Sequence, residues 1–147
     1  MNPTNHSIEF SFYQLSLLSF LLESHPELAE QRTFIKGRAA QAAEAYTTTF
    51  MEGGDTQQCQ SAASKVLYAG LHFSRHDTIV NILWREFSAN VKAEDAREYA
   101  IRLRPLLDPI FKKYTLSDDF AYTAEYQSLT TELTGAIQIK QEEYGKL

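Results

Sequence analysis

The stretch Ser74–Val91, SRHDTIVNILWREFSANV, constrains the fold more than any other part of the sequence. Ser74 followed by Asp77 matches the Ser-x-x-Asp pattern that caps the start of an α-helix. The apolar residues that follow would cover well over half of the helix circumference: Ile79, Val80, Ile82, Leu83, Trp84, Phe87 and Val91. A surface helix needs only one apolar stripe, so we expect this helix to be enclosed by others.

A second apolar segment, Ile8–Glu23, is rich in Leu and Phe. Its first residues, Ile8–Phe12, alternate between apolar and polar side chains, which leaves a short strand open there. The Leu-rich continuation favours a helix. We therefore expect a second enclosed helix that packs against Ser74–Val91, preceded by a flexible arm over residues 1–7.

Capping and turn residues divide the rest of the chain into amphipathic segments. Gly53-Gly54 ends one helix, and Asp55 or Thr56 begins the next. Pro105 and Pro109 should kink or divide a helix, because proline supplies no backbone N–H donor. The segments expected to be helical are Thr33–Met51, Thr56–Phe73, Ala93–Tyr114 and Thr123–Tyr144, the last closed by Gly145, with Gly135 marking a close helix approach.

These elements predict an all-α fold. We expect a compact multihelical single domain over residues 1–147, with about five to seven helices and two largely buried central ones. The length of 147 residues suits one domain, and the apolar fraction of 44% can supply a core.

The charge and the cysteine content limit the partners and the cellular compartment that we expect. The net charge is −5, yet residues 61–113 carry nine Lys and Arg against six Asp and Glu. This basic middle segment indicates either charge balance within the fold or a surface for an anionic partner. The single Cys59 excludes an internal disulfide, and its neighbours supply no activating base. Without a visible signal peptide or membrane span, we expect a soluble, cytoplasmic protein.

The densest polar cluster contains His72, His76 and Asp77. Imidazole and carboxylate groups can bind a divalent metal. The pattern is equally typical of a capped helix junction, which we favour because no third His or HExxH motif lies nearby. We therefore expect no bound metal and no cofactor.

Two further groups of charged residues are candidates for binding. Asp118 and Asp119 could form a metal-binding or an acid/base pair, but capping of the following turn explains them more simply. Arg97, Arg102 and Arg104 could contact phosphates. The acidic residues among them favour instead a solvated face with ion pairs such as Glu98–Arg102.

Three segments resemble a Bacteroidetes family of small proteins of uncharacterised function that is often carried near mobile elements. They are LSLLSFLLESHPEL (Leu15–Leu28), LHFSRHDTIVNILWREF (Leu71–Phe87) and KYTLSDDFAYTAEYQSLTTELTGAIQI (Lys113–Ile139). The resemblance spans nearly the whole chain. It implies a multihelical fold with two central enclosed helices, and it implies no activity and no catalytic residues.

The sequence thus favours a non-enzymatic module that contacts a protein partner, either another protein or a second copy in a homodimer. Exposed aromatic residues among Phe73, Trp84, Tyr122 and Tyr126 are the expected contacts. A nucleic-acid-binding accessory factor that uses the basic middle segment is a less favoured alternative, and a metal-dependent enzyme is the least favoured. We expect no membrane contact.

Overall fold

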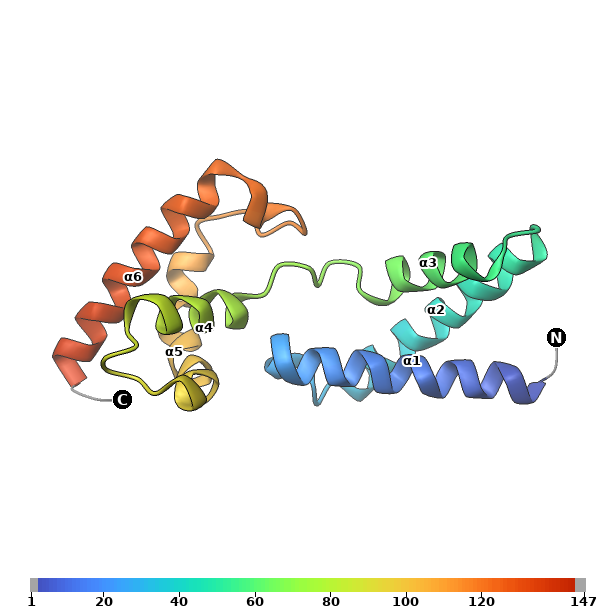
Figure 1. Cartoon of the computed structure of the whole chain (residues 1–147), viewed down its shortest axis with the longest axis horizontal. Coiled ribbons are helices and arrows are strands. Elements are labelled where there is room, and N and C mark those ends of the chain that lie inside the picture. Colours follow the sequence, from blue (N-terminus) through green and yellow to red (C-terminus); the bar gives the residue numbers. More distant parts are fainter. Residues whose placement is uncertain (1–2, 145–147) are drawn as a thin grey trace. The chain divides into compact units, whose positions relative to one another are not determined.

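The computed structural model describes residues 3–144, and these form an all-α fold (Figure 1). The α-helices are α1 (Pro3–Ser24), α2 (Arg32–Met51), α3 (Thr56–Leu67), α4 (Arg75–Glu86), α5 (Ala96–Phe111) and α6 (Ala124–Tyr144). Short 3-10 turns lie at η1 (Pro26–Leu28), η2 (Ala93–Asp95) and η3 (Phe120–Tyr122). The predicted fold class and number of helices are confirmed.

The described residues divide into two compact units, one ending at Leu71 and the other beginning at His72. Unit 1 contains α1 to α3 and unit 2 contains α4 to α6. Each unit has its own cluster of buried apolar side chains. The two apolar helices of the sequence therefore contribute to different buried clusters, α1 to that of unit 1 and α4 to that of unit 2. The expectation that they pack against each other stays a prediction.

Unit 1 is built on a close pairing of α2 and α3, which Figure 1 shows as a helical hairpin. Ala39, Ala42 and Ala63 are completely buried in it, and such small side chains allow helix axes to approach closely. Gly53 adopts a φ of +93° between the helices. Asp55 then caps α3 by accepting from the backbone N–H of Gln58 at 2.8 Å, in a reciprocal capping box. The predicted restart at Asp55 is confirmed.

Helix α1 packs on α2 through one stripe, formed by Tyr13, Leu17 and Leu21. Its opposite side exposes Phe12, Leu15 and Leu22. The prediction of an enclosed helix therefore does not hold for α1. Apolar side chains around most of a helix indicate burial on average, but packing against α2 covers only one side.

The start of α1 also differs from the sequence-based expectation. The helix begins at Pro3, so residues 3–7 are helical rather than an arm, and residues 1–2 lie outside the described part. Ile8–Phe12 is helical rather than a strand. Helix propensity of the Leu-rich continuation outweighs this short alternation. The predicted end at Gly145 lies outside the described residues.

Unit 2 is organised around α4, which packs against α5 and α6. Ser74 caps α4 by accepting from the backbone N–H of Asp77 at 2.9 Å, as predicted. Ile79, Ile82 and Leu83 are almost fully buried, which confirms enclosure for this helix. Helix α4 ends at Glu86, however, and Val91 reaches the core from the turn that follows.

Helix α5 is continuous through Pro105 and Pro109, so of the two predicted effects, a kink or a division, the division is wrong. Both prolines are exposed. The carbonyl groups that lack an N–H partner, those of Ile101 and Pro105, lie on this solvent-facing side, where water can satisfy them. The buried face of α5 is completed by Leu103 and Leu107.

Candidate functional site

The polar cluster at the start of unit 2 does not converge on one point. His72 is exposed, and its Nε2 lies 4.0 Å from Oδ2 of Asp118. Asp77 faces Arg97 instead, with 3.9 Å between Oδ1 and Nη1. His76 is buried, 3% exposed. Over residues 3–144 the structure contains no group of three or more His, Cys, Asp or Glu side chains arranged to hold a metal ion.

Asp118 and Asp119 differ in role. Oδ1 of Asp118 accepts a hydrogen bond from the backbone N–H of His72 at 3.2 Å, so this carboxylate connects two loops of unit 2. Asp119 precedes η3 and its side chain makes no capping hydrogen bond. The expected capping of the following turn is therefore wrong for Asp119.

The three arginines of α5 do not form one basic face. Arg97 lies over the ring of Trp84 at 5.6 Å, and Arg102 lies over Tyr99 at 5.4 Å. Arg102 is five residues beyond Arg97, which places it about 140° around the helix. Arg104 shares the side of Arg97 and is partly buried. The three cations are therefore distributed around the helix, and Arg97 and Arg102 stack on rings of their own unit.

Other cations of the basic middle segment face carboxylates. Nη1 of Arg75 donates to Oδ1 of Asp108 at 3.0 Å. Lys113 forms an ion pair with Glu132, which also accepts from the Tyr114 hydroxyl. The hydrogen bond from Lys113, followed by that from Tyr114, lowers the pKa of Glu132. These contacts of Arg75 and Lys113 therefore balance charge within the fold.

The four aromatic residues proposed as partner contacts lie in different environments. Phe73 is buried, with its ring 5.2 Å from that of Phe120 in an edge contact. Tyr126 is partly buried beside them. Trp84 is 41% exposed, and its Nε1 donates to the carbonyl oxygen of Ala93 at 3.0 Å. Tyr122 alone of the four is almost fully exposed, at 89%.

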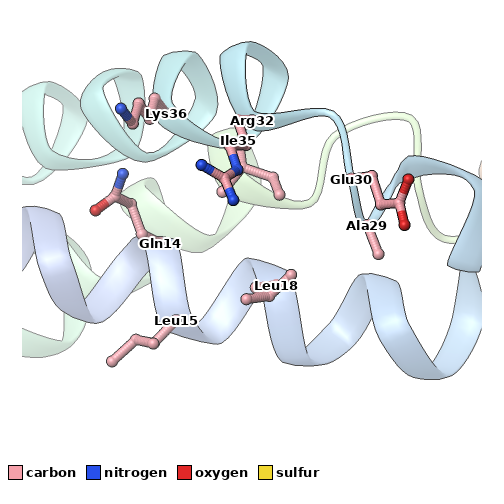
Figure 2. Close-up of a pocket in the computed structure, with 8 residues that line it drawn as sticks. All are labelled: Gln14, Leu15, Leu18, Ala29, Glu30, Arg32, Ile35 and Lys36. Carbon is pink, nitrogen blue, oxygen red and sulfur yellow. The ribbon is translucent and has the colours of Figure 1, made fainter.

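Sequence reasoning missed a pocket in unit 1, between α1 and the start of α2. Its volume is about 610 Å³. Figure 2 shows Leu15 and Leu18 on α1, the turn at Ala29, and Arg32 and Ile35 on α2. The polar residues that complete the lining are Gln14, Glu30 and Lys36. An apolar floor with a charged rim is suited to an amphipathic ligand.

An exposed apolar surface adjoins this pocket through Leu15. We define the α1 face as Phe12, Leu15, Ser19 and Leu22. Its apolar members are 62%, 68% and 61% exposed in chain order. Their spacing of three and four residues places them on one side of the helix. The apolar residues of this face are evident in the sequence, but the sequence pattern led us to expect them in a buried core.

A smaller pocket of about 310 Å³ lies in unit 2 between the end of α4 and α6. Its threonine hydroxyls bond within α6: Thr130 and Thr131 both donate to the Gln127 carbonyl oxygen, and Thr134 donates to that of Thr130. The hydroxyl donors are thus used by the helix itself. This pocket offers less apolar contact than the pocket of unit 1.

The structure defines an all-helical protein with an exposed apolar face and an adjoining pocket of mixed polarity. None of the described helices has both the length and the apolar character that crossing a bilayer requires. Residues 5–146 match the model of a domain of unknown function, DUF1896, and the chain belongs to that family.

A solved structure supports the same fold. Protein PG0816 from Porphyromonas gingivalis, a member of the Bacteroidetes, is 36% identical in sequence, with a TM-score of 0.93 over 98% of each chain. The predicted resemblance to a Bacteroidetes family of uncharacterised function is thereby confirmed. Comparison with curated proteins finds no match.

Proposed function

We propose that this chain is a non-enzymatic protein-protein interaction module of the cytoplasm, and that the α1 face is its principal contact surface. The observation that carries the proposal is the exposure of Phe12, Leu15 and Leu22 along one side of α1. Exposed apolar side chains aligned along one side of a helix favour a contact site, because covering them removes apolar area from water.

The composition of α1 supports this proposal. From Phe10 to Leu22 the helix contains no charged side chain. A helix side that faces water permanently is usually polar or charged. Tyr122, exposed on η3 of unit 2, is a second apolar contact in the proposal.

The alternatives receive less support from the geometry. A nucleic-acid-binding role would use the basic middle segment, but Arg75 faces Asp108, Arg97 faces Asp77 and Lys113 faces Glu132. A metal-dependent enzyme would need converging ligands, and His72 and Asp77 face different partners. The proposal includes an association with mobile elements, on which the partner protein would also be encoded.

Site-specific photo-crosslinking of the full chain in its native host tests the proposal. A photoreactive residue at Leu15 or Leu22 should capture a protein of discrete mass. The matched controls are Gln60 on α3 and Ser128 on α6, which are exposed polar positions outside the α1 face as defined above. Equal labelling at all four positions, or none at Leu15 and Leu22, would contradict the proposal, as would capture of nucleic acid.

A further inference from the structure

We infer that the α1 face and the adjoining pocket receive an amphipathic helix of a partner protein that has carboxylates beside its apolar stripe. The inference rests on the proposed function and specifies its partner. The shape of the surface, its charge and the lack of carboxylates between Phe12 and Leu22 of α1 each support one part of it.

The shape of the surface favours a helix. Phe12 to Leu22 spans about 15 Å at the rise of an α-helix, which matches roughly three turns of a partner helix lying alongside. Docking of an extended peptide onto a sheet needs a free strand edge, and the described part of the chain contains no strand. A helix can insert apolar side chains between Leu15 and Leu18 of α1 and Ile35 of α2.

The charge of the pocket rim favours carboxylates. Arg32 and Lys36 are four residues apart on α2 and so project from the same side of the helix. Within residues 10–143, whose side chains are described, neither forms an ion pair. Glu30 supplies one negative charge to the rim, and Figure 2 shows its carboxylate pointing away from the guanidinium group of Arg32.

The start of α2 adds to this positive field. Its first turn contains no acidic residue, and no side chain caps it. The backbone N–H groups of a helix start attract negative charge. A partner carboxylate beside Arg32 would face both this helix end and the guanidinium group.

A second copy of the chain is a poorer occupant. If two α1 faces packed together, the contacting residues from Phe12 to Leu22 would bring no carboxylate to Arg32 or Lys36. The two cations would then border an apolar interface without a partner, which reduces its stability. A partner helix with acidic residues satisfies both the apolar face and the rim.

Two designed helical peptides with the same leucine stripe test the inference, one with glutamates beside the stripe and the other with lysines. Fluorescence anisotropy with the full chain should show that the acidic peptide binds and the basic peptide does not. The double variant Arg32→Glu/Lys36→Glu should weaken binding of the acidic peptide by about tenfold. Leu15→Asp should abolish it.

Lys65→Glu on α3 is the control, because it reverses one positive charge, as each half of the double variant does, at an exposed position outside the pocket. It should leave peptide affinity unchanged. Circular dichroism would verify that each variant is folded. If Leu15 still captures a protein by crosslinking but the acidic peptide binds no better than the basic one, the inference is wrong and the proposed function stands.

The remaining outcomes are also decisive. If neither peptide nor any cellular protein is captured through α1, both the inference and the proposed function fail. If the chain sediments as a dimer that Leu15→Asp converts to a monomer, the occupant is a second copy and the acidic partner helix is excluded.

Discussion

Nε2 of His25 donates a hydrogen bond to the backbone carbonyl oxygen of Leu71 at 2.8 Å, across 46 residues of sequence. The imidazole is buried at the end of α1, and its ring lies 5.6 Å from that of Phe20. This hydrogen bond fixes the last residues of unit 1 to the turn that follows α1. Arg38 makes a related contact, since its Nη1 donates to the carbonyl oxygen of Leu67 at 3.2 Å.

Replacing His25 by alanine should therefore destabilise unit 1. The carbonyl oxygen of Leu71 would lose a buried donor, and we expect the free energy of unfolding to fall by about 1–3 kcal/mol. Urea denaturation followed by circular dichroism measures the change, and faster amide hydrogen exchange near Leu71 would locate it. His72→Ala, at an exposed imidazole, is the control and should change stability by less than about 0.5 kcal/mol. Equal effects of the two variants would contradict this role of His25.

The cap that Ser74 forms at the start of α4 leads to a second prediction, which concerns unit 2. Ser74→Ala removes the acceptor for the Asp77 backbone N–H and should lower stability by about 0.5–2 kcal/mol. Trp84, the sole tryptophan, lies on α4 and reports the unfolding of this unit by fluorescence. Ser128→Ala, at an exposed position inside α6, makes the same change without removing a cap, and should not lower stability. If the unfolding transition of Ser74→Ala coincides with that of the unmodified chain, the Ser74 side chain does not stabilise α4 as a cap.

Glu132 should make the stability of unit 2 depend on pH. The hydrogen bonds from Lys113 and then Tyr114 lower its pKa in the folded state. The stabilisation is therefore complete above the ordinary glutamate pKa and is lost as pH falls through the lowered folded value. The hydrogen bond to Glu132 also raises the pKa of Tyr114, so a second contribution is present below the ordinary tyrosine pKa of 10.0 and is lost as pH rises through the raised value.

Glu132→Gln removes the carboxylate on which both shifts depend. Stability measured by Trp84 fluorescence should then vary less at the acidic end and at the alkaline end. Glu142→Gln, on the exposed part of the same helix, should retain the pH dependence of the unmodified chain. The same acid profile in Glu132→Gln and in the unmodified chain would refute the assignment.

Local features of this fold were predictable from the sequence. The caps at Asp55 and Ser74 are formed by side chains that bond the backbone within a few residues, so their pattern is visible in the chain itself. The helical periodicity likewise predicted the all-α class. The continuity of α5 was not predictable from Pro105 and Pro109, because it depends on which side of the helix faces solvent.

Long-range packing was not predictable in the same way. Apolar residues surround most of α1, so their pattern cannot show which side α2 covers and which side Leu15 exposes. The pocket exists only because the turn at Ala29 brings Arg32 and Ile35 beside α1. Of the charged residues that the sequence suggested as a binding site, Arg97 faces Asp77 and Asp118 accepts from the backbone N–H of His72, both contacts within unit 2.

Two helical glycines allow a final prediction. Gly135 was expected to mark a close helix approach, but a Cβ built there meets no atom within 4 Å, and the same is true of Gly37 in α2. The expected close approach at Gly135 is therefore wrong, because both glycines are exposed to solvent. Gly37→Ala and Gly135→Ala should each raise stability by about 0.5–1 kcal/mol, since alanine has less backbone entropy to lose on folding.

Gly54→Ala provides the contrast, because its Cβ would lie 2.6 Å from Cγ2 of Thr49 and 2.9 Å from the Thr49 carbonyl oxygen. The backbone oxygen cannot withdraw without disturbing the end of α2, so this variant should lose about 1–3 kcal/mol. Thermal unfolding of the three variants side by side measures the difference. Gly135→Ala could be as destabilising as Gly54→Ala only if a partner or a neighbouring segment approached α6 at that position. Such a result would show that Gly135 does not lie on an exposed surface of unit 2.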